Sequence, residues 1–366
     1  MKKHLLIYGA GAIGRGYVPW VFSPNEFEFT FVESSSELRN LLNKNRSYKT
    51  YCTREGAYIQ QEVAVLNCLA PGEELDLITK VDGVITAVGP RQVLELILPL
   101  SKATCPVVLF ENDATLAPLL QKLTENPRIY FGVPDVITSN TAPMAFLTDD
   151  PLAIVTEDGK CFIEDGAVSL GGESLYVSSE ELQKQWVAKL YIHNTPHCIA
   201  AYLGSLLNCT YLHEGMGHAQ IFNMVEGAMG EMASMVKMRY GLDAQFVDWY
   251  AKKELSRFSN ILLYDPINRV AREPFRKLEP HNRLVGAAQL ALASGIVPMF
   301  ILKGILSAFL YNKKNDPDFN ITYLIRGLSP HHFLKLIINL DTHEALFILL
   351  VEQWDSIMTE LKGLHP

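Results

Sequence analysis

Hydrophobic and polar positions change their spacing about halfway along the chain. Before residue 178, short apolar runs end in glycine or polar residues, as the buried strands of an α/β fold do. These runs predict strands at 5–8, 27–32, 81–88, 107–110 and 131–136. A Tyr-, Thr- and Val-rich stretch at 47–66, with Gly56 inside it, predicts a β-hairpin, and glycine-punctuated alternation predicts further strands over 153–177.

From Ser178 onward the apolar positions recur at helical spacing. The pattern therefore predicts two domains, an α/β domain at 1–177 and a mainly α-helical domain at 178–366. One run, 284–302, has no charged residue and is long enough for a membrane span to be considered. Gly295 and Pro298 interrupt this run, so we favour a buried helical hairpin.

The first predicted strand leads directly into a glycine motif. The GxGxxG pattern comprises Gly9, Gly11, Ala12, Ile13 and Gly14. Such a turn brings backbone N–H groups against a pyrophosphate at the start of a helix. The second strand ends in Glu33, where a carboxylate accepts hydrogen bonds from an adenosine ribose and repels a 2′-phosphate. The sequence thus predicts an N-terminal Rossmann-type dinucleotide-binding domain that takes NAD as its cofactor in preference to NADP.

The ends of two later strands carry further candidates for the cofactor crevice. Thr86, Val88 and Gly89 lie where the strand at 81–88 ends, a position that borders the ligand in open parallel sheets. Asn112 follows the strand at 107–110. It either lies at the same crevice or, together with Asp113, only caps the helix predicted at 114–123. The pattern leaves both interpretations open.

The most chemically distinctive stretch is the helix predicted over 178–207. At about 100° per residue, Lys189, His193, Asn194 and His197 lie within roughly 140° of one another on it. A lysine can exchange a proton, an amide can hold an oxyanion, and an imidazole can orient a hydroxyl. The alternative is an amphipathic helix whose polar face meets water. The catalytic interpretation places this helix at the wall of a cleft between the domains.

Zinc is a further alternative for the two histidines. His193 and His197 have the i, i+4 spacing that puts two rings on one helix face. No cluster of cysteine or aspartate with ligand spacing accompanies them, so no metal is expected. The segment 211–218 (YLHEGMGH) has one residue too many between its histidines for a zinc-protease motif.

Basic residues gather between 257 and 278 in a chain that is acidic as a whole. The group consists of Arg257, Arg269, Arg272, Arg276 and Lys277, and the net charge of the chain is −8. Guanidinium and ammonium groups can hold a phosphate or carboxylate. Arginines that pair with the chain's own acids would give the same composition, and both interpretations remain open.

The net charge and the placement of the cysteines limit the classes of binding partner and of cellular compartment. The net charge argues against nucleic acid or an anionic membrane as the main partner, which leaves a small molecule. The six cysteines are scattered without a CxxC pair, as in a reduced, cytoplasmic protein. With 366 residues the chain is long enough for two cores, and we expect a monomer or small homo-oligomer.

The motifs together resemble a known family. Lys189-x4-Asn194-x2-His197, followed by the residues AYLG at 201–204, resembles the signature helix of the polyol-specific long-chain dehydrogenases, the mannitol dehydrogenase family. Supporting segments are GAGAIGRG at 9–16, TAVGP at 86–90, EN at 111–112 and RVAREPFRKL at 269–278. The resemblance covers essentially the whole chain. It implies a metal-independent, NAD-dependent oxidoreductase of a polyol or sugar phosphate, with mannitol 1-phosphate and fructose 6-phosphate as the first pair to test.

The resemblance also implies roles for individual residues. Lys189 corresponds to the general acid/base, Asn112 and Asn194 to the amide pair that holds the alkoxide, and His197 to the histidine that positions the reacting hydroxyl. Arg272, Arg276 and Lys277 are expected to hold a terminal phosphate. Ser139-Asn140 stands where the family usually has Asp-Arg, which bears on specificity. A dehydrogenase of an unphosphorylated polyol or a sugar acid of the hexuronate type, and a non-catalytic NAD-binding sensor, are the alternatives.

Overall fold

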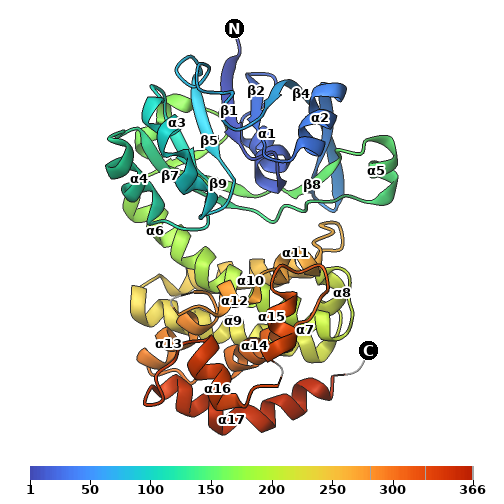
Figure 1. Ribbon diagram of the computed structural model, residues 1–366, viewed down its shortest axis with the longest axis vertical. Helices are drawn as coiled ribbons and strands as arrows, with labels where there is room; N and C mark the ends of the chain where they lie inside the picture. Colours follow the sequence, from blue (N-terminus) through green and yellow to red (C-terminus); the bar gives the residue numbers. More distant parts are fainter. Residues whose placement is uncertain (281, 326, 365–366) are drawn as a thin grey trace. The chain divides into compact units, whose positions relative to one another are not determined.

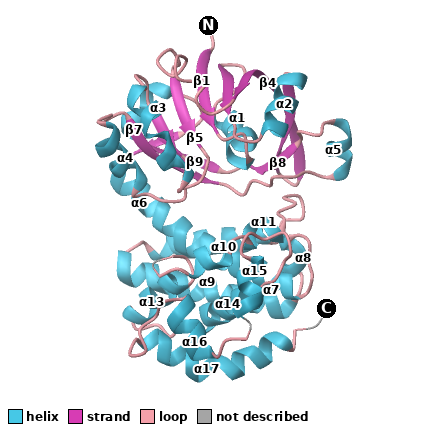
Figure 2. Cartoon of the chain, in the orientation of Figure 1, coloured by secondary structure: helices cyan, strands magenta, loops and turns pink. Residues whose placement is uncertain are grey.

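The computed structural model describes residues 1–280, 282–325 and 327–364 and divides them into two compact units (Figure 1). The first unit contains Met1–Trp186 together with Leu262–Tyr264, and the second contains Val187–Ile261 and the described residues from Asp265 onward. Strands belong to the first unit, whereas the second is helical (Figure 2). This is the predicted fold class, an α/β unit of the Rossmann type followed by a mainly α-helical unit.

The sequence pattern predicts the domain change at Ser178, where helical spacing begins, whereas the units divide inside helix α6 (Ser179–Ala188). Packing explains the difference. The ring of Trp186, near the end of α6, lies edge-on to Phe131 at 5.3 Å between centroids. Most of α6 therefore belongs to the sheet unit although its sequence is helical.

Within the described residues the strands form one ten-stranded sheet in the order β10-β9-β7-β6-β5-β1-β2-β4-β3-β8. The strands are β1 (Lys3–Tyr8), β2 (Phe27–Val32), β3 (Ser47–Arg54), β4 (Ala57–Leu69), β5 (Gly83–Thr86), β6 (Val107–Leu109), β7 (Ile129–Asp135), β8 (Ile154–Glu157), β9 (Lys160–Glu164) and β10 (Leu175–Val177). The central strands β7, β6, β5, β1, β2 and β4 run parallel, and β3 and β4 form the predicted antiparallel hairpin. The strand predicted at 81–88 is shorter, because the chain turns at Gly89, whose φ is +106°.

The innermost strands carry apolar runs because both faces of a parallel sheet are covered there. Leu5, Leu6 and Ile7 of β1 have no exposed surface, and Phe29 and Phe31 of β2 belong to the same core. The helical segments of this unit are η1 (Ala12–Tyr17), α1 (Val18–Val21), α2 (Ser36–Asn45), η2 (Gln92–Leu96), α3 (Ile97–Lys102), α4 (Leu116–Thr124), α5 (Met144–Asp149) and η3 (Asp165–Leu170). This arrangement brings the ends of β1, β2 and β5 to one edge of the sheet, where the glycine motif lies.

In the second unit, helix α7 (Thr195–Leu206) lies at the centre. Its residues from Thr195 to Ser205 are all buried, and it packs against α14, α9, α11 and α8. Contacts on all sides explain why the middle of this helix is mostly apolar. The other segments are η4 (Lys189–Asn194), α8 (Leu212–Met216), α9 (Ala219–Tyr240), α10 (Ala244–Phe258), α11 (Ile267–Ala271), α12 (Pro274–Leu278), α13 (Val285–Ala293), α14 (Met299–Leu310), α15 (Phe319–Ile325), α16 (Pro330–His332), η5 (Phe333–Ile337) and α17 (Ala345–Lys362).

The uncharged run at 284–302 forms two helices. Helix α13 ends at Ala293 and α14 begins at Met299, with Gly295 at a φ of +75° and Pro298 between them. The predicted break is therefore confirmed. Among the described residues, no helix has both the length and the apolar character that crossing a membrane requires.

Candidate active site

The glycine motif forms a tight turn after β1, with open space next to Gly11 in its middle. A side chain at Gly9, which has a φ of +92°, would meet the carbonyl oxygen of Ala87 at 2.5 Å, and one at Gly14 would meet the carbonyl oxygen of Gly9 at 1.9 Å. Nothing lies within 4 Å of the same position on Gly11. Gly9 and Gly14 thus permit the turn and the close strand–helix packing, while Gly11 leaves its backbone open to a pyrophosphate. Ala12 and Ile13 form the first turn of η1.

Glu33 ties the end of β2 to this turn. Its Oε2 accepts a hydrogen bond from the N–H of Ala10 at 2.9 Å, and its Oε1 accepts one from the N–H of Ser35 at 2.9 Å. The carboxylate is therefore fixed directly beside the glycine motif. This is the place from which the acidic residue of a Rossmann fold contacts a ribose.

A second carboxylate, that of Glu111, holds the turn after β5. It accepts hydrogen bonds from the N–H groups of Val88 at 3.0 Å and Gly89 at 2.8 Å, while Thr86 is fully buried at the end of β5. Glu111 is 3% exposed, and burial raises the pKa of its carboxyl group. The hydrogen bonds from the two N–H groups oppose this rise. No role for Glu111 was predicted from the sequence, although an acid directly after a buried strand is a visible signal.

Asn112 and Asp113 have separate positions after β6. Asp113 Oδ1 accepts hydrogen bonds from the N–H and the hydroxyl of Thr115, so Asp113 makes the turn that leads into α4. The side chain of Asn112 is exposed and makes no hydrogen bond within the described part of the chain. Capping therefore does not account for Asn112, whose role at the active site stays a prediction.

The helix predicted over 178–207 consists of three pieces. Ser178 Oγ accepts from the N–H of Glu181 at the start of α6, and the π-helical turn η4 separates α6 from α7. Pro196 explains the change in winding, because it has no N–H to donate to the carbonyl four residues earlier and its ring crowds that carbonyl. Pro196 is visible in the sequence, yet the predicted angles assumed a regular helix.

All four polar side chains of this stretch are buried. Lys189 is 7% exposed, His193 and Asn194 are each 4% exposed, and His197 is 8% exposed. The two imidazole rings lie 4.8 Å apart between centroids. A polar helix face that only meets water is therefore excluded, and these side chains must find partners within the protein or in a ligand.

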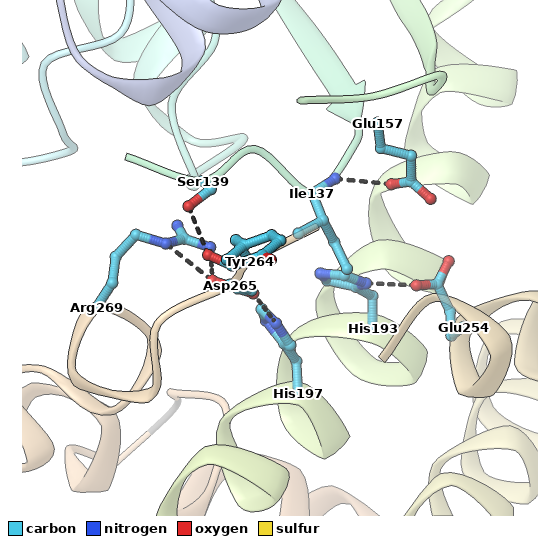
Figure 3. Close-up of polar contacts among 9 residues, drawn as sticks. All are labelled: Ile137, Ser139, Glu157, His193, His197, Glu254, Tyr264, Asp265 and Arg269. Atoms are coloured by element: carbon cyan, nitrogen blue, oxygen red, sulfur yellow. Dashed lines mark hydrogen bonds and ion pairs between the residues drawn. The ribbon is translucent and has the colours of Figure 1, made fainter. Parts of the chain in front are cut away.

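Each histidine has a carboxylate partner distant in sequence (Figure 3). His193 Nδ1 lies 2.5 Å from Glu254 Oε2. Glu254, on α10, has no exposed surface and also forms ion pairs with Arg257 and Lys253. Arg257, which the sequence places in the basic group, is thus bound to an acid of the same helix.

His197 Nε2 lies 2.8 Å from Asp265 Oδ2, and Arg269 Nη2 lies 2.6 Å from Asp265 Oδ1 (Figure 3). Asp265 is 3% exposed. Burial acts to raise the pKa of its carboxyl group, but Arg269 and His197 outweigh it and lower the pKa to about 2. The ionised carboxylate accepts a hydrogen bond from the Nε2–H of His197 and so fixes the orientation of the ring. Sequence reasoning missed both Glu254 and Asp265.

Some of the remaining basic residues form ion pairs with carboxylates and others do not, among the residues that the structure describes. Arg276 Nε lies 3.3 Å from Glu273 Oε2, whereas the side chain of Arg272 is exposed. Lys277 is 2% exposed and donates from Nζ to the carbonyl oxygen of Arg272. The alternative of internal ion pairs therefore holds for Arg269 and Arg276. Among the described residues, Lys277 forms no ion pair with a carboxylate.

Ser139 stands at the position where the family usually has an aspartate. Its Oγ donates to the carbonyl oxygen of Tyr264 at 2.7 Å, both residues being part of the first unit, and accepts from the N–H of Thr141. Ser139 is fully buried and Asn140 is exposed. The serine therefore holds the loop that leads to Pro143.

In the described ranges, no group of three or more His, Cys, Asp or Glu residues is arranged to hold a metal ion. His193 and His197 have i, i+4 spacing, but each ring is bound to a different carboxylate. Metal independence itself remains a prediction.

Two family models match the chain and together cover more than half of it. The mannitol dehydrogenase Rossmann domain matches residues 3–124, and the mannitol dehydrogenase C-terminal domain matches residues 182–323. The chain belongs to the mannitol dehydrogenase family. The family resemblance predicted from the sequence is therefore confirmed, and the protein is a member of a family of oxidoreductases.

Individual relatives of this mannitol dehydrogenase family member are similar over nearly their full length. A mannitol-1-phosphate 5-dehydrogenase of Caldanaerobacter subterraneus subsp. tengcongensis is 28% identical, with 98% of each chain covered. A protein of the same name from an Exiguobacterium species is 28% identical over 97% of this chain and 98% of its own.

Among solved structures, Pseudomonas fluorescens mannitol 2-dehydrogenase in ternary complex with NAD and D-mannitol has a TM-score of 0.81 at 14% identity, covering 99% of this chain and 92% of that one. A D-sorbitol dehydrogenase has a TM-score of 0.71 at 15% identity, covering 99% of this chain and 94% of that chain. At these identities the likeness establishes the fold.

Proposed function

We propose that this protein is an NAD-dependent dehydrogenase that interconverts mannitol 1-phosphate and fructose 6-phosphate. The observation that carries the proposal is the group Lys189, Asn194 and His197, buried together where a π-helical turn meets α7. Family membership supports the reaction class. The two curated relatives that match the chain over nearly its full length support the phosphorylated substrate.

The first unit has the features that NAD binding requires. Gly11 leaves open space beside the backbone of the turn, and Glu33 is fixed next to that turn, where it would accept hydrogen bonds from the ribose. Thr86, Val88 and Gly89 would border the nicotinamide half, on a turn that Glu111 holds rigid. When bound, NAD accepts a hydride from the polyol carbon or, as NADH, returns it to the ketone.

In the oxidation direction, Lys189 removes the proton of the reacting hydroxyl. A lysine serves as a base near neutral pH only in an apolar or positively charged setting, and Lys189 is 7% exposed. Asn194 Nδ2 has no hydrogen-bond partner within the described residues, so it is available to donate to the developing alkoxide. Asn112 is the proposed second amide donor.

His197 orients the hydroxyl in this mechanism. Because its Nε2–H is engaged by Asp265, its Nδ1 is the nitrogen left for the substrate. In the reduction direction the same groups act in reverse, with Lys189 returning the proton to the alkoxide oxygen.

A substrate panel tests the proposal. NAD⁺ reduction is followed by absorbance with mannitol 1-phosphate, mannitol, sorbitol and a hexuronate-derived polyol acid. We expect turnover with mannitol 1-phosphate at a kcat/KM far above that of the other substrates. Absence of turnover with every member of the panel, in a protein that binds NADH, would favour the non-catalytic sensor instead.

An unphosphorylated polyol is the second candidate. Arg269 and Arg276 are bound to acids of the chain, and Ser139-Asn140 stands in place of the usual Asp-Arg. Both observations weaken the case for a phosphate held by these two arginines. Higher kcat/KM with mannitol than with mannitol 1-phosphate would establish this alternative.

A further inference from the structure

The helical unit contains buried hydrogen-bond donors that have no acceptor. Asn194 Nδ2, the hydroxyl of Tyr202 and Nε of Arg283 are all buried without a partner in the described part of the chain. Tyr202 has no exposed surface and Asn194 is 4% exposed. Buried donors are paired in nearly all folded proteins because an unpaired one has lost its hydrogen bonds to water, so a binding partner for these groups is expected.

Two of these donors share one face of the central helix. Asn194, Cys198 and Tyr202 follow one another at four-residue intervals, which aligns them along η4 and α7. Eight residues of helix correspond to on the order of 12 Å. This distance is comparable with the length of an extended hexitol that carries a terminal phosphate. A substrate whose reacting carbon lies at Asn194 can therefore reach Tyr202 with its other end.

Positive charge is concentrated beside Tyr202. Lys277 Nζ lies 5.8 Å from the centre of the Tyr202 ring. Arg283 is anchored to the start of α7, because Thr195 Oγ1 donates to its carbonyl oxygen at 2.8 Å, and the N–H of Leu284 donates to the carbonyl oxygen of Lys277. Neither Lys277 nor Arg283 has a carboxylate partner among the described residues.

The pKa values of Lys277, Arg283 and Tyr202 agree with a buried site that, among the described residues, lacks a negative charge. Burial, together with the neighbouring Arg283 and Arg276, lowers the pKa of Lys277 to about 7. Burial also lowers the pKa of Arg283. Burial raises the pKa of the Tyr202 hydroxyl well above its ordinary value, so it stays protonated and can donate. An anion would supply the acceptors and the countercharge that the chain does not provide.

We infer that Lys277, Arg283 and Tyr202 form the site that binds the phosphate group of a polyol phosphate. This inference rests on the proposed function and adds Arg283 and Tyr202, to which no role has been assigned so far. A phosphate monoester presents three strong acceptor oxygens and nearly two negative charges, whereas a hydroxyl offers neither. The side chain of Arg272 is exposed and that of Arg269 is bound to Asp265, so neither is assigned to the site.

Three variants test the site through the preference of the protein for mannitol 1-phosphate over unphosphorylated mannitol. Tyr202→Phe removes one hydroxyl, Arg283→Met removes the guanidinium, and Arg283→Lys keeps the charge without the planar fork. We expect kcat/KM for mannitol 1-phosphate to fall by about 10- to 100-fold in Arg283→Met, and by less in Tyr202→Phe, with unchanged KM for NAD⁺. Activity with unphosphorylated mannitol, measured at saturating concentration, should change little.

Matched controls separate a binding role from a general disturbance. Tyr311→Phe removes a hydroxyl from the ring that lies edge-on to Tyr202 at 5.5 Å, and Arg128→Met removes an exposed arginine of the first unit. Both control variants should prefer mannitol 1-phosphate over mannitol as strongly as the wild-type protein does. Circular dichroism and thermal unfolding identify any variant that does not fold, in which case Tyr202→Phe and Arg283→Lys carry the test.

Inorganic phosphate serves as a probe that does not depend on turnover. We expect it to bind the wild-type protein by calorimetry and to bind Arg283→Met at least tenfold more weakly. A wild-type preference for mannitol 1-phosphate that no variant at 202, 277 or 283 alters would overturn the inference and leave the proposed function standing. Phosphate binding lost in Arg283→Met, with no dehydrogenase activity in the wild-type protein, would support the site while rejecting the proposed function.

Discussion

His197 Nε2 lies 2.8 Å from Asp265 Oδ2, although 68 residues separate the two in sequence. Asp265 is held from its other oxygen by Arg269, so the carboxylate cannot rotate away from the ring. Asp265 directly follows Tyr264, whose φ of +47° is unusual for a bulky residue and turns the chain at this point. The position of the proposed hydroxyl-orienting histidine is thus set by a residue that it meets only in the folded protein.

Replacing Asp265 with asparagine should impair turnover without removing a group that touches the substrate. The amide offers its N–H₂ or a weaker acceptor to Nε2, so the ring loses its fixed orientation and protonation. We expect kcat to fall by at least about 10- to 100-fold, the scale found for carboxylates that orient a metal-ligating histidine. The pH profile of kcat should also shift, which a purely structural effect would not produce. Asp248→Asn, at an exposed ion pair with Lys237, is the control and should retain wild-type kinetics.

Lys189→Ala should abolish turnover while leaving NADH affinity nearly unchanged, because the lysine acts on the substrate proton. The loss of a positioned general base costs about 10²–10⁴-fold in rate. Stopped-flow turnover and NADH fluorescence titration measure the two quantities. Lys184→Ala is the matched control, since Lys184 lies on α6 and forms exposed ion pairs with Glu180 and Glu181. Activity that survives in a folded Lys189→Ala protein would falsify the mechanism.

Asn194→Ala should reduce kcat by roughly 10²–10³-fold, the cost of losing one donor to an oxyanion. The Nδ2 of Asn194 has no partner within the described residues, so the substitution breaks no hydrogen bond at that atom. Unfolding by urea should therefore begin at nearly the same concentration as in the wild-type protein. A large loss of stability together with unchanged kcat would indicate a structural residue.

NAD should bind more tightly than NADP, and Glu33 should be responsible. Its carboxylate is fixed by the N–H groups of Ala10 and Ser35 and would repel a 2′-phosphate. Glu33→Ala and Glu33→Arg should reduce the difference in affinity between NAD and NADP, as measured by titration of both cofactors. Glu37→Ala, in the first turn of α2, is the control for a nearby negative charge. Equal affinities in the wild-type protein would contradict the role of Glu33.

The affinity for the phosphorylated substrate should decline as the pH rises through about 7. Lys277 has a pKa lowered to about 7, so it is charged below this pH and loses its proton above it. The charged form binds an anion, and KM should therefore rise above pH 7. The groups that act on Lys277 are Arg283, Cys198, Arg276 and Glu273, of which only Glu273 carries a carboxylate.

A Lys277→Met variant provides the comparison, because the phosphate of the substrate titrates with a pKa near 6 in both proteins. We expect KM in Lys277→Met to be high at every pH and to lack the rise above pH 7. The same rise in both proteins would assign it to another group.

The sequence by itself determined the features that depend on local backbone geometry and on the spacing of apolar residues. The continuous apolar run in β1 marks a strand covered on both faces, and Gly9 and Gly14 mark positions where a side chain would collide with a carbonyl. The break between α13 and α14 follows from the positive φ of Gly295 and from Pro298, which has no N–H to continue a helix. The grouping of Lys189, Asn194 and His197 also follows from their spacing along one segment.

Only the tertiary structure decided which partner each polar group meets. Glu254, Asp265 and Glu111 contact His193, His197 and the turn after β5 from distant parts of the chain. The basic residues at 257–283 look alike in sequence, yet within the residues that the structure describes some form ion pairs with acids while Lys277 and Arg283 do not. The physical reason is that burial and ion pairing depend on contacts between segments far apart in sequence, which local propensity does not specify.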